Sequence, residues 1–150
     1  MRVPQSVNAI RQKVMRGLTK GVGKSNFGKG KIVEPAKISR ILINRPNQRL
    51  GNLLLVTPLL QEIEVRFPNA KVDVFVKGML APIVFKGYEN VERTIRLPKK
   101  PFKEKLAYTK VWFTIRSRKY DLVINIDKSS SSGRLATKFS NSEFKFFGDL

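Results

Sequence analysis

Apolar and polar positions recur along residues 38–150 with two periods, one typical of strands and one typical of helices. Short apolar runs predict strands at 41–43, 71–76, 91–97, 120–126 and 143–147. Segments between them predict helices at 53–67, 79–85, 102–118 and 134–139. Because strands and helices alternate with short connections, we expect an α/β fold with a doubly wound parallel sheet.

The segment from Ile41 to Phe67 organises the rest of the chain. An apolar strand is followed by a polar turn at 46–52, and then by a long helical pattern. Pro58 lies inside that pattern, where it removes a hydrogen bond and predicts a kink or a delayed helix. Strand, turn and helix form the first half of a βαβ unit, whose ligand crevice lies beyond the carboxyl ends of the strands.

Residues 1–37 differ from this pattern and are predicted to be a separate extension, before a domain at 38–150. They hold nine Lys or Arg residues and one acid, Glu34. Residues 7–18 have an apolar helical face and basic flanks, which suits an anionic membrane surface, a helix packed on the domain, or a nucleic-acid-binding arm. Residues 17–31 lack the glycine spacing of a P-loop and predict a flexible basic linker.

The amino-acid composition excludes several kinds of catalytic and metal site. The chain of 150 residues has length for one domain, and with no cysteine or histidine it excludes disulfides, Ser-His and Cys-His nucleophiles and a typical zinc site. Its formal charge of +19 predicts a polyanionic partner, which could be nucleic acid, an anionic membrane or a phosphorylated substrate. Without a long apolar run or a secretory signal, we expect a cytoplasmic location.

Two polar turns follow strongly apolar strands and should meet at one edge of the sheet. The first contributes Arg45, Asn47 and Arg49, and the second contributes a lysine, serines and an arginine: Lys128, Ser129, Ser131 and Arg134. Such groups suit phosphate, carboxylate or sugar hydroxyls. The alternative, helix capping by Asn52 and the serines, accounts for one residue in each turn and leaves the four cations unexplained.

At these residues the chain resembles the heptosyltransferase-type glycosyltransferases of family 9. The family's strand, Leu-Gly-Asp turn and Thr-x-Pro helix correspond to Leu50-Gly51-Asn52, Thr57 and Pro58. A second signature, Arg/Lys-x-Tyr-Asp and a polar turn, corresponds to residues 118–121 and 129–135.

The resemblance implies the N-terminal, Rossmann-like half of a two-domain GT-B inverting transferase. That half would bind an anionic, lipid-linked saccharide acceptor of lipopolysaccharide synthesis, with Gly51 among the binding residues. A donor such as ADP-heptose would bind the C-terminal half, which these residues lack, so we expect no bound cofactor and no transfer by the 150 residues alone.

The catalytic base is the point at which the chain departs from the family pattern. Asn52 occupies the position of the family's presumed base, an aspartate, and an amide does not accept that proton. Asn125 likewise stands where family members often carry aspartate. Asp127 is the nearest candidate for the base, and Asn52 would then only orient the acceptor.

The resemblance also implies a location. Residues 7–20 would hold the protein on the inner face of the bacterial inner membrane. Two other functions stay open, a basic nucleic-acid-binding α/β module and an inactive truncated remnant. Nucleic acid is not favoured, because neither an RNP-like strand nor a recognition helix is recognisable.

Overall fold

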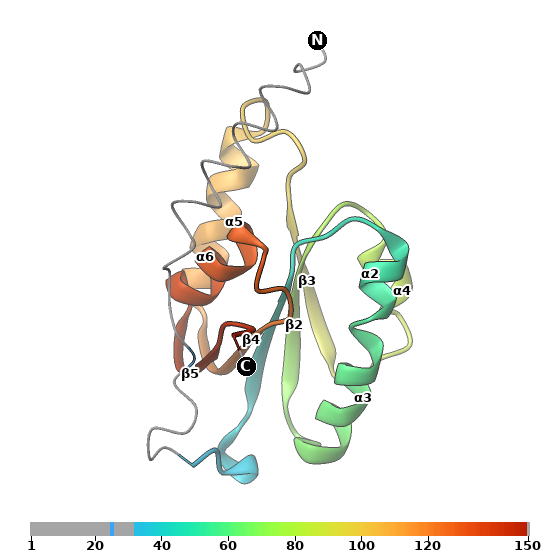
Figure 1. The fold of residues 1–150 in the computed structure, drawn as a ribbon, viewed down its shortest axis with the longest axis vertical. Coiled ribbons are helices and arrows are strands. Elements are labelled where there is room, and N and C mark those ends of the chain that lie inside the picture. Colours follow the sequence, from blue (N-terminus) through green and yellow to red (C-terminus); the bar gives the residue numbers. More distant parts are fainter. Residues whose placement is uncertain (1–24, 26–31, 150) are drawn as a thin grey trace.

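The computed structural model describes residue 25 and residues 32–149. These residues form a parallel sheet of five strands in the order β3-β2-β1-β4-β5 (Figure 1). The strands are β1 (Arg40–Arg45), β2 (Lys71–Lys77), β3 (Val91–Leu97), β4 (Lys119–Asn125) and β5 (Asn141–Phe146). A 3₁₀ turn, η1 (Pro35–Lys37), precedes the sheet. The predicted α/β fold with a parallel sheet is confirmed.

Helices cover both faces of the sheet. The helices α2 (Leu50–Leu54), α3 (Thr57–Arg66) and α4 (Ala81–Val84) lie on one face, and α5 (Lys105–Ser117) and α6 (Ser131–Phe139) lie on the other (Figure 1). The chain therefore winds outward from β1 in one direction and from β4 in the other. This is the doubly wound arrangement that the sequence predicted.

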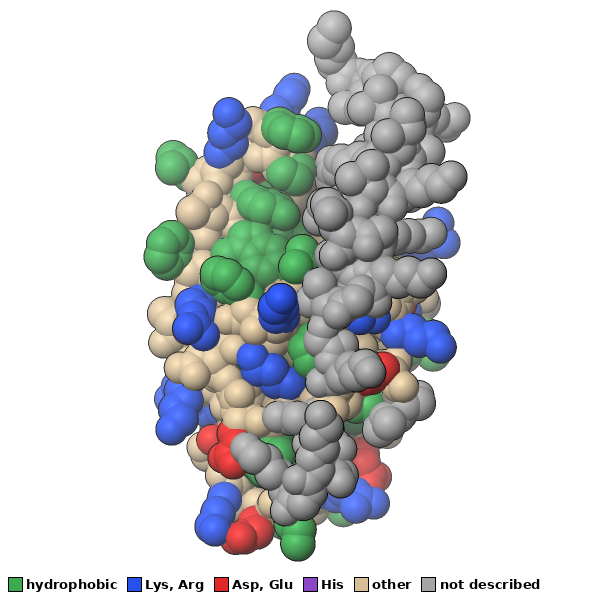
Figure 2. Space-filling model, turned by 60° about the vertical axis from the view of Figure 1, so that its left-hand side comes forward, with side chains coloured by type: hydrophobic (Ala, Val, Ile, Leu, Met, Phe, Trp, Pro, Cys, Tyr) green, Lys and Arg blue, Asp and Glu red, His purple; other side chains and the backbone are tan. Residues whose placement is uncertain are grey.

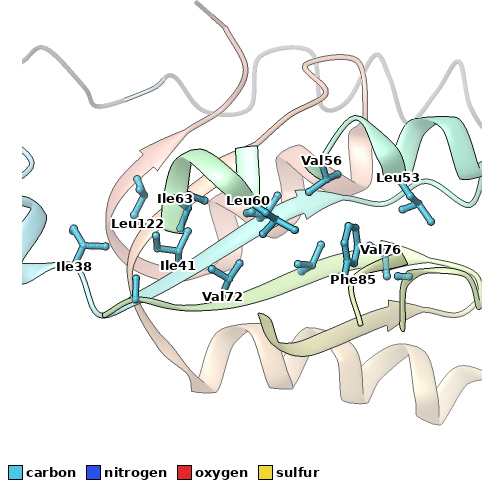
Figure 3. Close-up of a cluster of buried hydrophobic side chains, with 14 of the residues drawn as sticks. Ile38, Ile41, Leu53, Val56, Leu60, Ile63, Val72, Val76, Phe85 and Leu122 are labelled. Carbon is cyan, nitrogen blue, oxygen red and sulfur yellow. The ribbon is translucent and has the colours of Figure 1, made fainter. Parts of the chain in front are cut away.

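Alternate residues of each strand face two separate cores. In β1, Ile41 and Ile43 pack under α2–α4, whereas Leu42 packs under α5 and α6. The first core is the larger one, and Leu53, Leu60 and neighbouring helical residues fill it (Figure 3). Burial on both faces explains why the central strands are continuous apolar runs.

All four predicted helices differ in their limits: the helix predicted at 79–85 spans only Ala81–Val84, and the other three differences follow from single groups. Pro58 splits the predicted helix 53–67 into α2 and α3, and it takes the second position of α3, where a missing N–H costs little. The helix predicted at 102–118 begins at Lys105, because Lys103 and Glu104 bond back to the Lys100 carbonyl in a turn. The helix predicted at 134–139 begins at Ser131, since Ser130 caps it.

A buried polar network joins the amino ends of β2, β3 and β4. The Tyr120 hydroxyl donates to Asp73 at 2.7 Å, and Arg118 Nη1 lies 3.3 Å from the same carboxylate. Arg118 also pairs with Glu92. Burial raises the pKa of Asp73, and the hydrogen bond from Tyr120 and the charge of Arg118 offset only part of that rise.

Asp121 joins β4 to the start of β1. Its Oδ2 accepts from the Ser39 amide at 2.8 Å, the Ser39 hydroxyl at 2.9 Å and the Arg40 amide at 2.9 Å. Burial raises the pKa of Asp121, but the hydrogen bonds from Ser39 and Arg40 outweigh it and leave the pKa below its ordinary value. The signature at residues 118–121 therefore has a structural role at the amino edge of the sheet.

The predicted extension lies outside the described residues except for Ser25 and residues 32–37. The basic amphipathic helix at 7–18, the membrane segment 7–20 and the domain division at 37/38 therefore stay predictions. None of the described helices has the length and apolar content needed to cross a membrane.

Candidate functional site

The carboxyl ends of β1 and β4 form the topological switch point of the sheet. The two strands are neighbours, with Asn44 paired in register to Asn125, and the Asn44 carbonyl accepts from the Ile126 amide at 3.2 Å. Beyond this point the chain leaves β1 toward α2 on one face and β4 toward α6 on the other. Ligands of doubly wound sheets bind in the crevice that such diverging connections create.

An ion pair joins the two predicted turns at this edge. Arg45 Nη1 lies 3.0 Å from Asp127 Oδ2, and the side chains are 12% and 29% exposed. Asp127 Oδ1 accepts from the Ser129 amide at 2.9 Å and from its hydroxyl at 2.6 Å. One carboxylate thus shapes the second turn and anchors the arginine of the first.

These contacts bear on Asp127 as a candidate base. Burial raises its pKa, but the hydrogen bonds from Ser129 and the charge of Arg45 outweigh burial and bring the pKa below the ordinary value. A general base works best with a pKa near the working pH. The contacts of Asp127 therefore suit a residue that positions Arg45, and its assignment as the base stays a prediction.

The first turn is shaped by Asn47. Its side-chain Oδ1 accepts from the backbone amide of Arg49 at 2.9 Å, and its backbone amide donates to the Arg45 carbonyl at 2.6 Å. Arg49 is exposed and precedes α2 directly. Because α2 has only five residues, its dipole at the turn is smaller than a helix over 53–67 would supply.

Gly51 and Asn52 lie within α2, so Asn52 is not the helix cap. A Cβ built on Gly51 would meet no atom within 4 Å, so nothing in the described chain requires glycine there. Asn52 is partly exposed, and its side chain forms no hydrogen bond with the described residues. Both positions are thus accessible at the edge where the acceptor is expected.

The second turn brings the remaining predicted residues to the start of α6. Ser130, rather than Ser129 or Ser131, caps the helix by accepting from the Gly133 amide at 3.1 Å. An Arg134 guanidinium nitrogen donates to the Lys128 carbonyl at 3.4 Å. Lys128 and Ser129 are exposed, and Ser131 and Arg134 are partly buried. Capping accounts for Ser130 alone, and the exposed side chain of Lys128, unlike its carbonyl, has no hydrogen-bond partner among the described residues.

Two buried asparagines below the turns were missing from the predicted site. Asn125 Nδ2 donates to the carbonyls of Asp127 at 2.9 Å and Phe147 at 3.0 Å, and Asn44 Nδ2 donates to Thr137 at 2.8 Å. The Oδ1 atoms of both asparagines lack a partner among the described residues. An amide buried in an apolar strand was the sequence signal that could have found them.

Gly133 and Asn125 fit each other closely. A Cβ at Gly133 would lie 2.2 Å from Asn125 Oδ1, so only glycine permits α6 to approach β4 there. Aspartate at position 125 would turn a carboxylate toward two carbonyl oxygens. The structure thus gives a physical reason for an amide rather than a carboxylate at position 125.

None of the described residues forms a group of three or more Asp, Glu, His or Cys side chains that could hold a metal ion.

Comparison with known proteins gives a partial match in sequence and in fold. No family model matches the chain. Lipopolysaccharide heptosyltransferase 3 of Escherichia coli is 32% identical over 78 residues, which are 51% of this chain and 23% of that protein. The chain therefore corresponds to a minor part of this relative.

Two solved structures are similar to the chain. A glycosyl transferase of family 9 from Veillonella parvula matches with a TM-score of 0.53 and 19% identity, over 71% of this chain and 30% of that one. The Escherichia coli heptosyltransferase WaaC, solved with ADP, has a TM-score of 0.49 and 19% identity, over 71% of this chain and 40% of that one. The fold likeness and the sequence match together confirm the predicted resemblance of this chain to the family 9 heptosyltransferases.

Proposed function

We propose that the chain is the acceptor-binding part of an inverting glycosyltransferase that acts in lipopolysaccharide or cell-envelope glycan synthesis. The sequence match to a lipopolysaccharide heptosyltransferase supports the class of reaction. The observation that carries the binding role is the ion pair between Arg45 and Asp127, which joins the two cationic turns at the switch point. Arginine in such a pair can bind an anionic sugar through further guanidinium nitrogens.

The acceptor in this proposal is an anionic, lipid-linked saccharide. Arg45, Arg49, Lys128 and Arg134 supply the charge, and Asn47, Gly51, Ser129 and Ser131 supply polar atoms or open space beside them. Asn52 orients the acceptor hydroxyl through a hydrogen bond. Its amide does not take the proton, so it is not the base. Asp127 is the candidate base among the residues at this edge, although its lowered pKa makes it a weak base.

Donor binding and transfer belong to a second, C-terminal half in this proposal. We expect the 150 residues alone to bind the acceptor without transferring sugar from ADP-heptose. The protein would lie on the inner face of the bacterial inner membrane, held there by the basic residues within 7–20. The formal charge of +19 supports an anionic surface as a partner.

Calorimetric titration of the full chain tests this function. The probe is a truncated lipopolysaccharide inner core, freed of its lipid and still carrying its anionic sugars. A neutral oligosaccharide of similar size is the control. We expect the anionic probe to bind and the neutral one not to bind, and we expect salt to weaken the affinity for the anionic probe. Equal binding of both probes, or preferential binding of single-stranded RNA over the anionic sugar, would contradict the proposal.

A further inference from the structure

The layer formed by α5 and α6 exposes apolar side chains on its solvent face. Three of these are large and strongly exposed, namely Leu106 at 89%, Phe113 at 69% and Phe139 at 53%, and Phe102, in the turn before α5, is 76% exposed. Leu106 and Phe113 are seven residues apart on α5 and therefore lie on the same side of that helix. Figure 2 shows hydrophobic side chains gathered on this side of the molecule, with lysines and arginines beside them.

A groove lies between the two helices beside this stripe. It encloses about 730 Å³ and is lined by aromatic, aliphatic and cationic side chains: Tyr108, Trp112, Arg116, Leu135, Lys138 and Phe139. The Trp112 ring meets Tyr108 and Phe139 edge-on, with centroids 6.1 and 6.2 Å apart. Partly exposed tryptophan and tyrosine are the side chains that favour the boundary between water and lipid.

Charge distinguishes this layer from the helices on the other face of the sheet. The segments α5 and α6 carry five cations and no Asp or Glu: Lys105, Lys110, Arg116, Arg134 and Lys138. By contrast α2, α3 and α4 carry Glu62, Glu64 and a single cation, Arg66. That layer also exposes large apolar residues, such as Val65 at 79% and Ile83 at 75%. Apolar exposure is therefore common to both layers, but only the helices α5 and α6 combine it with cations and no acidic residue.

We propose that the α5–α6 face, with its groove, docks on an anionic phospholipid bilayer. Apolar side chains of Leu106 and Phe113 would enter the headgroup region, while the flanking lysines meet lipid phosphates. The uniform positive charge of the two helices favours a bilayer over a second copy of the same cationic face, which would repel it. The same charge disfavours the basic segment 7–18 as the occupant.

Docking here would bring the candidate site close to the membrane. The helix α6 begins at the acceptor-binding turn with Ser131 and Arg134, and its next residue, Leu135, lines the groove. A lipid-linked acceptor could then reach the turn while its lipid remained in the bilayer. The inference extends the proposed function, yet the soluble acceptor probe tests that function without lipid.

Trp112 reports on this face directly, because it is the single tryptophan of the chain and lines the groove. The experiment mixes the full chain with vesicles of phosphatidylglycerol and phosphatidylcholine, and with vesicles of phosphatidylcholine alone. We expect the Trp112 emission to shift to the blue with the anionic vesicles only, and brominated lipids to quench it. Binding that leaves the emission unchanged would assign the membrane contact to residues 7–20 and overturn the proposal.

Matched variants separate the two layers. The pair Leu106→Ser and Phe113→Ser should weaken vesicle binding about tenfold, through lost apolar contact with lipid. The control pair Val65→Ser and Ile83→Ser removes similar exposed groups from the other layer and should change binding less than about twofold. Equal losses in both pairs would overturn the proposal.

Charge variants complete the test. Lys110→Gln with Lys138→Gln should weaken vesicle binding roughly twenty-five-fold, because each cation near an anionic surface is worth about a factor of five. Lys71→Gln with Lys86→Gln, away from the groove, is the control. A Trp112 emission that shifts with protein concentration in the absence of lipid would instead indicate a second copy and contradict the bilayer. Binding of the soluble acceptor probe should be the same in all four variants.

Discussion

The two edges of the sheet use similar polar residues for different purposes. At the amino edge, the carboxylates of Asp73 and Asp121 accept from Tyr120 and from the start of β1, so they join neighbouring strands. At the carboxyl edge, the Arg45–Asp127 pair joins two turns, while buried amide oxygens below it lack partners among the described residues. Unpaired buried atoms occur at both edges, since the side-chain amide of Asn90 at the amino edge also lacks a partner among the described residues, so the edges differ in what their carboxylates join.

The comparison teaches how to separate stability from binding in this fold. Substitutions at the amino edge should lower stability and leave acceptor affinity unchanged. Substitutions at the carboxyl edge should weaken acceptor affinity and leave stability unchanged, except where a side chain also supports the packing of α6.

Arg118→Met should have the largest effect. It removes the cation beside the buried Asp73 and beside Glu92, and should lower the free energy of unfolding by about 3 kcal/mol. Urea unfolding measures the loss, and the exposed neighbour Lys119→Met is the control. A loss of stability equal to that of the control, or a weaker acceptor affinity, would break the distinction between the edges.

Gly133→Ala should come next, and it tests the one place where the site and the packing coincide. The new Cβ would lie 2.2 Å from Asn125 Oδ1, so α6 or the asparagine must move, at a cost of about 1–3 kcal/mol. Gly87→Ala adds a Cβ where no atom lies within 4 Å and should be neutral. Equal urea midpoints for the two variants would contradict the close contact between α6 and β4.

Arg45→Gln should weaken binding of the anionic acceptor probe about tenfold, since hydrogen bonds to charged groups are worth about 1.5–3 kcal/mol. Arg40→Gln, at the opposite end of the same strand, should leave binding unchanged. Calorimetric titration gives both affinities. Similar affinities for the two variants would remove Arg45 from the site.

Asp121→Asn tests the amino edge through pH. The pKa of Asp121 is lower in the folded protein, so its stabilising effect is present above the unfolded pKa of about 3.9 and is lost as the pH falls through the folded value. The variant should lose about 1 kcal/mol at pH 7 and show a shallower decline below about pH 4. Urea unfolding at several pH values measures both, with the exposed Glu64→Gln as control. An unchanged acid dependence would contradict the role of Asp121.

Lys128→Ala and Arg134→Ala should have the smallest effects, a loss of acceptor affinity of about threefold each, because both belong to a site open to solvent. In a protein that also contains the donor-binding half, the same variants should raise the acceptor KM. An unchanged KM in both would exclude the second turn from the acceptor site.

Much of the fold was predictable from the sequence because burial on both faces leaves long apolar runs. The central strands β1, β2 and β4 were found for this reason, and the ends of all five strands differ from the predicted ones by at most two residues. Helix limits were less predictable, since they depend on single groups. Ser130 caps α6 and Pro58 takes the second position of α3, and periodicity alone reveals neither helix limit.

The candidate site was predictable in outline but not in its contacts. Both polar turns reach the same edge of the sheet, as parallel strands require, and Arg45 meets Asp127 across it. No local pattern links residues 82 positions apart, so the sequence did not indicate that pair. Nor did it separate Ser130, the cap, from its neighbours. The sequence grouped residues 118–121 with the polar turn at 129–135 in one signature. In the structure, the side chains of 118–121 stabilise the amino edge of the sheet, at the opposite end of β4 from that turn.

We propose that an anionic saccharide binds at the carboxyl edge, between the turns at 45–52 and 127–134. Amide chemical shifts of the ¹⁵N-labelled chain, titrated with the lipid-free inner-core oligosaccharide, test it most directly. We expect the largest shifts in these two turns and no change at residues 118–121. Shifts concentrated at the amino edge or on α3, or the same shifts with a neutral oligosaccharide, would contradict it.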